Sequence, residues 1–125
     1  MAGMSDAYLN DIGDAGAGLA AYIALIDDTD NVIGDRVNMD GEGTNPEWTG
    51  AGTGEDNPGT IRLSENITFP VDGGTTVKGW RAFSEAEAGI AYGGADFVQA
   101  ETFTNAGEFV LLAAQTAIHH EVQAG

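Results

Sequence analysis

The sequence predicts a mainly β protein: a small antiparallel β-sandwich or a jelly-roll-like barrel, with a short N-terminal helix. Residues 61–71 alternate between apolar and polar side chains, as a strand with one buried face does. Further apolar segments of strand length recur about every ten residues, separated by turns rich in Gly, Asn and Asp. The length of 125 residues suits one domain, so we expect residues 1–125 to form a single unit.

The first predicted element is a helix or arm within residues 1–19. Ser5 can cap the helix, and Tyr8, Leu9 and Ile12 share one helical face. Each glycine inside a helix costs about 1 kcal/mol relative to alanine. We therefore expect the glycines of residues 13–18 to end the helix.

Two strands and a long loop follow the helix. Residues 20–26 form an apolar run, residues 32–37 read as a second strand, and the turn formers of residues 27–31 connect them. Residues 39–59 are acidic and rich in glycine around a single tryptophan, Trp48. Loops this long are usually functional or mobile, so we expect this one to become ordered at a contact.

Residues 60–122 form the main β region. The expected strands are 61–71, 75–83, 95–103, 108–113 and 116–122, and the pair Gly93-Gly94 separates Tyr92 from the strand that follows. Alternation and turn spacing also identify the residues expected in the core. These are Ile61, Leu63, Ile67, Phe69, Val71, Phe97, Phe109 and Leu111.

The charge of the chain is strongly negative. Twenty acidic residues face four basic ones, which gives a formal net charge of −16. Such a surface repels phosphate, so we expect no nucleic-acid partner. An ordinary acidic, soluble domain would explain this charge. We favour a halophilic host, because lysine occurs once, Asp slightly outnumbers Glu, and molar salt shortens the Debye length to about 3 Å.

The N-terminal residues lack the basic region of a signal peptide. The longest apolar run, residues 18–26, is shorter than the roughly 20 residues of a membrane span. We therefore expect a chain that is made and used in solution, without membrane insertion. Cysteine is absent, which excludes disulfides and thiolate metal sites within the sequence.

Asp27, Asp28 and Asp30 are weak candidates for a metal site. An EF-hand loop needs oxygen ligands at positions 1, 3 and 5 and glycine at position 6, and a loop starting at Asp28 places Val32 and Ile33 at positions 5 and 6. A solvated acidic turn is the favoured interpretation, and a looser oxygen-ligand site stays open. His119 and His120 are adjacent, and adjacent side chains of a strand point to opposite faces, so one ion cannot easily bind both imidazoles. We predict no bound metal and no cofactor for this chain.

No catalytic motif is found in the sequence. Glu85 and Glu87 are close together, but no apolar pocket around them is indicated that would raise a carboxyl pKa for acid catalysis. There is no Gly-x-Ser-x-Gly motif and no cysteine nucleophile. We predict that the protein is not an enzyme, and a small hydrolase is a remote alternative.

Four residues are candidates for a protein interface. Trp48 lies in a polar loop, where a tryptophan often anchors a partner. Trp80 stands next to Arg81, and a core tryptophan with solvated basic neighbours is the favoured alternative there. Arg62 lies on the polar face of residues 61–71, a face suited to packing beside neighbouring subunits.

Three segments carry a resemblance to a known family: residues 66–84, residues 92–95 and residues 101–109. The chain resembles small β-rich virion proteins of tailed viruses, described as tail-fibre-like or minor structural proteins. The shared pattern is Thr-Phe-Pro-Val, a Gly-Thr-Thr-Val turn, a Trp-containing strand, a Gly-Gly step and a Thr-Phe…Ala-Gly turn. The resemblance covers residues 60–118 and, loosely, the first 26. Residues 27–31 and 39–59 depart from it.

The resemblance implies a non-enzymatic structural component of a tailed virus, here one with a haloarchaeal host. The chain would be a tail-fibre-like or decoration protein in several copies or as a homo-oligomer, contacting other capsid or tail subunits. Its location would be the virion, after assembly in the host cytoplasm. The alternative is a receptor- or glycan-binding module of the virion, in which the loop around Trp48 contacts a host surface glycan or protein.

Overall fold

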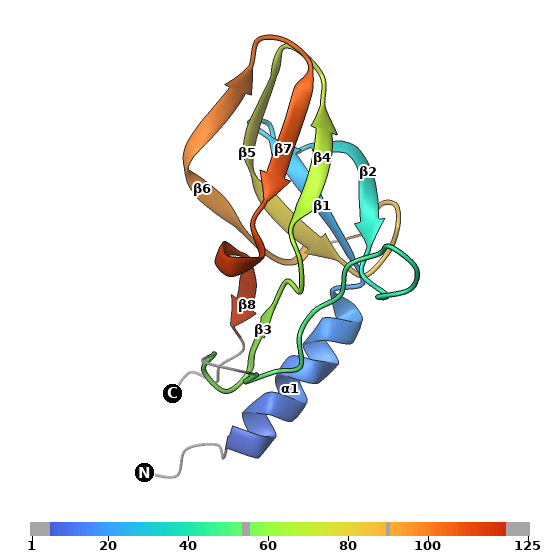
Figure 1. Cartoon of the computed structure of the whole chain (residues 1–125), viewed down its shortest axis with the longest axis vertical. Helices are drawn as coiled ribbons and strands as arrows, with labels where there is room; N and C mark the ends of the chain where they lie inside the picture. The colour runs from blue at the N-terminus through green and yellow to red at the C-terminus, as the bar shows by residue number, and fades with distance from the viewer. Residues whose placement is uncertain (1–5, 54–55, 90, 120–125) are drawn as a thin grey trace.

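The computed structural model describes residues 6–53, 56–89 and 91–119, and it is mainly β with one N-terminal helix (Figure 1). Helix α1 precedes two β layers, and a short 3-10 helix, η1, lies near the end of the described chain. The elements are α1 (Asp6–Leu19), β1 (Tyr22–Asp27), β2 (Val32–Asn38), β3 (Thr60–Arg62), β4 (Ile67–Val71), β5 (Thr75–Phe83), β6 (Ala91–Phe103), β7 (Gly107–Leu111), η1 (Ala113–Gln115) and β8 (Ala117–His119).

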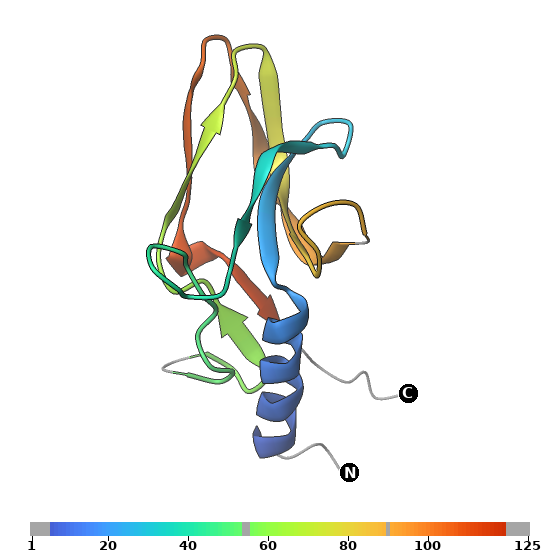
Figure 2. The same ribbon diagram turned by 90° about the vertical axis from the view of Figure 1, so that its right-hand side faces the viewer.

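The larger layer is a four-stranded antiparallel sheet in the order β2-β1-β5-β6. The smaller layer is the two-stranded ribbon β4–β7, and a second short ribbon, β3–β8, continues below it towards α1 (Figure 1). Figure 2 shows the sheet and the β4–β7 ribbon from the side as two separate layers. The prediction of a small β-sandwich with an N-terminal helix is confirmed.

The core lies between these layers. Five of the predicted core residues on residues 61–71 are buried, as is Leu111, while Phe97 and Phe109 are partly buried and pack against the core. The aromatic rings of Phe97 and Phe109 stack with centroids 5.1 Å apart. Periodicity therefore identified which side chains face inward.

The prediction of one continuous strand over residues 61–71 is wrong. β3 pairs with β8, whereas β4 pairs with β7, and the chain leaves both ribbons between them. Within this break Leu63 forms an isolated bridge with Trp48, and the Asn66 side chain accepts a hydrogen bond from the backbone N–H of Ala113. The side-chain alternation continues across the break, so the apolar pattern could not reveal it.

Helix α1 also differs from its prediction, because it continues through Gly13 and Gly16 to Leu19. Both glycines are buried against the rest of the chain. A Cβ atom on Gly13 would lie 2.7 Å from Cβ of Ala51 and 2.8 Å from the carbonyl oxygen of Gly59. The glycines thus permit close packing of the helix rather than ending it. The proposed capping residue, Ser5, is outside the described residues.

The loop of residues 39–59 packs against the domain instead of projecting from it. The backbone N–H of Ala51 donates to the Asp14 carboxylate of α1, and the N–H of Gly52 donates to the carbonyl of Thr60. Trp48 lies in the core cluster at 8% exposure. The contacts that position Ala51, Gly52 and Trp48 lie within the chain, not at a partner as expected from the sequence, because a turn-rich composition says nothing about tertiary contacts.

β6 starts earlier than predicted, at Ala91, and the Gly93-Gly94 pair lies inside it. Its pairing with β5 has a large irregularity: Val77 lies opposite Glu101, but Gly79 lies opposite Asp96. Residues 97–100 therefore bulge away from β5. β7 ends earlier than predicted, at Leu111. β8 starts at Ala117, one residue later than predicted, and the expected strand residues 120–122 are outside the described part.

Candidate functional site

The two tryptophans form a buried pair. Their ring centroids lie 6.1 Å apart, and the indole N–H of Trp48 donates a 2.9 Å hydrogen bond to the carbonyl of Ala20. Trp80 is 2% exposed. Both side chains belong to the core of this fold. The hypothesis of an exposed interface anchor is therefore wrong for both, and the favoured interpretation of Trp80 as a core tryptophan is confirmed.

Arg62 joins three segments of the chain. Its guanidinium makes an ion pair with Asp56 at 2.6 Å and also donates to the carbonyl of Ala114. The hydrogen bond to Asp56 raises the pKa of Arg62. This arginine connects β3 to the long loop and to η1, so contacts within the chain account for the position of its side chain.

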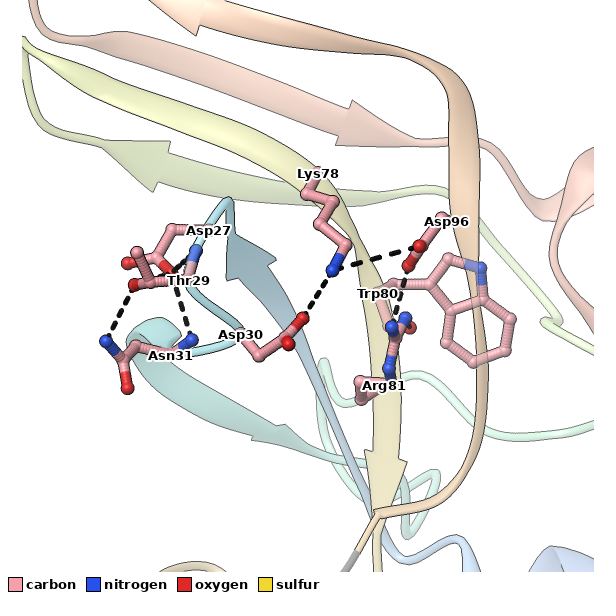
Figure 3. Close-up of polar contacts among 8 residues, drawn as sticks. All are labelled: Asp27, Thr29, Asp30, Asn31, Lys78, Trp80, Arg81 and Asp96. Carbon is pink, nitrogen blue, oxygen red and sulfur yellow. Dashed lines mark hydrogen bonds and ion pairs between the residues drawn. The ribbon is translucent and has the colours of Figure 1, made fainter.

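Arg81 and Lys78 share the carboxylate of Asp96 (Figure 3). The Arg81 guanidinium is 2.7 Å from Asp96, and this hydrogen bond is the main cause of the lowered pKa of Asp96. The Lys78 ammonium is 2.5 Å from Asp30, and that hydrogen bond raises the pKa of Lys78. These contacts connect the β1–β2 turn to β5 and β6.

The structure does not bring together the three aspartates that were weak candidates for a metal site, Asp27, Asp28 and Asp30. One oxygen of Asp27 accepts hydrogen bonds from the backbone N–H groups of Thr29 and Asn31 and from the Thr29 hydroxyl (Figure 3). These donors, led by the Asn31 N–H, lower the pKa of Asp27. Asp30 pairs with Lys78, whereas Asp28 is not brought into a shared cluster. Within the described ranges, no group of three or more carboxylates and imidazoles is placed to hold a metal ion.

The remaining polar candidates also have structural surroundings. The carbonyl of Glu85 accepts a hydrogen bond from Arg36, whose guanidinium lies 3.7 Å from the centre of the Phe83 ring. The ring nitrogen Nδ1 of His119 is 2.5 Å from the Thr60 hydroxyl. His120 and Glu121 lie outside the described residues. Within residues 6–53, 56–89 and 91–119, the structure groups none of these side chains into a recognisable acid–base or nucleophilic set.

A groove of about 460 Å³ lies between β6 and β7 and is called the β6–β7 groove below. It is lined by residues 95–99, residues 109–112 and the side of Trp80, with Gln115 and Thr116 at one end. The apolar side chains of Val98, Val110 and Leu112 are exposed along it, Val98 completely. Exposed apolar side chains gathered beside a groove are typical of a contact surface.

Sequence reasoning missed the β6–β7 groove. Phe97, Phe109 and Leu111 were interpreted as core residues, which is only part of their environment. One signal was available: residues 109–112 are four consecutive apolar residues, so a strand there must present apolar side chains on both faces. Only the lack of a covering strand shows that the second face is exposed.

The described residues contain no helix long and apolar enough to cross a membrane. Comparisons of the chain with protein-family models, with curated proteins and with solved structures gave no match.

Proposed function

We propose that this chain is a non-enzymatic structural component of a tailed virus particle, a small tail-fibre-like or decoration protein that acts through protein–protein contacts. The observation that carries the proposal is the β6–β7 groove with its exposed apolar side chains Val98, Val110 and Leu112. Such a surface suits a stable contact in an assembly better than the turnover of a substrate. The resemblance of residues 60–118 to virion proteins supports the particle as its location.

The acidic surface agrees with the same proposal. A net charge of −16 repels phosphate, which favours the outside of a particle over contact with packaged nucleic acid. It also fits a host with molar intracellular salt, where charge repulsion between neighbouring subunits is screened. The chain would then be assembled in the host cytoplasm and stay in the virion as one of several copies.

Receptor binding has lost its main support. That hypothesis relied on an exposed Trp48 in the long loop, and Trp48 is buried against Ala20 and Trp80. With Trp48 buried, structural assembly is the proposal that a specific exposed surface, the β6–β7 groove, supports.

Quantitative mass spectrometry of tailed particles purified in molar salt tests the proposal. We expect peptides of this chain at a fixed, multi-copy ratio to the major capsid or tail protein, and labelling of the particle surface by antibodies against the chain. A chain that is abundant in infected cells and absent from washed particles would contradict the proposal. Detection of a hydrolytic activity that a single carboxylate substitution abolishes would replace it with the remote alternative.

A further inference from the structure

Among the described residues, the smaller layer of the sandwich has no strand opposite β6. Four strands form one layer, while β4 and β7 alone form the facing ribbon. Within the described residues β7 pairs with β4 and with no other strand, so one edge of β7 is open. An open strand edge presents unpaired backbone N–H and C=O groups and is a template for another strand.

The β6–β7 groove has the position that such a strand would occupy. Trp80 of β5 and Phe97 of β6 line it on the side of the large sheet, and Phe109 and Leu111 of β7 line it on the other. The groove is therefore lined mainly by apolar side chains and includes residues of β7, whose second edge is open, as a site for strand addition requires.

The bulge of β6 leaves this side of the sheet accessible. The pairing with β5 stops at Asp96 and resumes at Glu101, so residues 97–100 have no ladder partner on β5. Val98, at the centre of the bulge, is completely exposed. Leaving such a side chain in water is unfavourable, and a strand placed beside β7 would cover part of it.

The charges around the groove indicate the chemistry of the partner. All four basic side chains of the chain already have acceptors within it: Arg62, Lys78 and Arg81 pair with carboxylates, and Arg36 bonds to backbone carbonyls. Glu101 on β6 and Glu108 on β7 do not line the groove but lie between its lining residues and the β6–β7 turn; both are exposed and make no ion pair among the described residues. A partner segment with lysine or arginine complements this border.

We propose that the β6–β7 groove binds an extended, basic segment of another protein, which adds as a strand to the free edge of β7. Alternate apolar side chains of this segment fill the groove, and flanking Lys or Arg side chains pair with Glu101 and Glu108. This inference deepens the proposed function and rests on its claim that the chain acts through protein contacts. A second copy of the same chain fits this border less well, because its four basic side chains already have acceptors within that copy.

Selection from a display library of random segments of about ten residues, using the full chain as bait, tests the proposal. We expect enriched segments with apolar residues at alternate positions and with Lys or Arg near their ends. Synthetic peptides of those sequences are then titrated against the full chain, with fluorescence anisotropy as the readout. Backbone amide shifts in NMR spectra should map to β7 and to residues 97–100.

Two double variants with matched controls identify the surface. Val110→Ser with Leu112→Ser should weaken peptide binding about tenfold, whereas Leu19→Ser, at an equally exposed position on α1, should leave it unchanged. Glu101→Gln with Glu108→Gln should weaken binding at about 0.15 M salt, and the effect should fade in molar salt. The control for this pair is Glu87→Gln, which lies in the β5–β6 connection.

The outcomes separate this proposal from the proposed function. Absence of enriched segments, or binding insensitive to both double variants, overturns the strand-addition site even if particles contain the chain. Self-association in sedimentation runs that the Val110→Ser and Leu112→Ser pair abolishes assigns the groove to a second copy and overturns the basic partner. Absence of the chain from particles with peptide binding intact overturns the virion proposal alone.

Discussion

Trp48 shows how a single side chain changes the meaning of a segment. Most of its neighbours in residues 39–59 are polar or glycine, yet its indole N–H bonds to Ala20 and its ring contacts Trp80. Hydrogen bonding of the N–H makes the burial of a tryptophan inexpensive. The polar residues around it form the turns that bring Trp48 back to the core.

Trp48→Ala should destabilise the isolated chain by about 3–5 kcal/mol, because it leaves a large cavity beside Trp80. Urea unfolding followed by Trp80 fluorescence measures this change. Val98→Ala, at a completely exposed position, is the control and should change stability by less than about 0.5 kcal/mol. An unfolding midpoint for Trp48→Ala equal to that of the native chain would contradict the burial of Trp48 in the core.

Asp27 should contribute a pH-dependent part of the stability. Its pKa is lowered in the folded chain, chiefly by the Asn31 N–H and then by the Thr29 hydroxyl. A lowered folded pKa gives stability that is present above the unfolded pKa of about 3.9 and is lost as the pH falls through the folded pKa. The Asp27→Asn variant should therefore melt below the native chain at neutral pH and approach it in acid.

Asp28→Asn is the matched control for Asp27→Asn. It removes the same charge from a neighbouring position that makes no hydrogen bond with the other described residues. Thermal melts of the native chain and both variants between about pH 2 and pH 7 separate the local bonds from the overall charge. A constant difference between the two variants across this range would show that the bonds to Asp27 contribute no pH dependence.

At the scale of elements, the contacts of α1 explain why glycine is found inside a helix. Intrinsic propensity disfavours glycine there by about 1 kcal/mol, which was the reason to expect an early end. The backbone of Gly13 lies against Ala51 and Gly59, so a larger residue would force the helix away from the loop. Packing outweighs propensity at this position.

Two substitutions in the same helix should therefore have opposite effects. Gly13→Ala should destabilise the chain by about 1–3 kcal/mol, because the new Cβ would overlap Ala51 and the Gly59 carbonyl. Gly18→Ala should stabilise it by up to about 1 kcal/mol, since nothing lies within 4 Å of a Cβ there. Chemical denaturation of both variants checks the prediction. Equal shifts in the same direction would contradict the close contact at Gly13.

The split between β3 and β4 is a second lesson at this scale. Ile61 precedes the break, Leu63 lies within it, Ile67 and Phe69 follow it, and all four are buried. A turn of four residues preserves the odd–even order of side chains, because the pattern has a period of two. Alternation therefore predicts which face is buried, while the partners β8 and β7 decide where each strand begins and ends.

For the molecule as a whole, the charge should make stability depend on salt. A net charge of −16 repels itself in the compact state, and the four basic residues are already committed to contacts within the chain. Screening shortens the Debye length from about 10 Å at 0.1 M to about 3 Å at 1 M. The free energy of unfolding should increase steeply between these salt concentrations.

Melting temperature measured in NaCl from about 0.1 M to molar concentration checks this prediction. Each kcal/mol of repulsion removed should raise the melting temperature by about 4 °C. Sucrose at comparable osmolality is the control, because it favours the compact state without screening charge. A melting temperature that is flat in salt, or that rises equally in sucrose, would leave an ordinary acidic domain and remove the argument for a halophilic host.

The sequence by itself determined the fold class, the inward-facing residues and the negative charge. Periodicity and turn composition are local properties, and the burial of Ile61, Phe69 and Leu111 follows from them. The position of Trp48, the partners of β3 and β4, and the β6–β7 groove required the tertiary structure. Each of these depends on which distant segments meet, and the groove depends on the smaller layer having only two strands among the described residues. A local sequence pattern does not show whether the edge of a strand has a pairing partner.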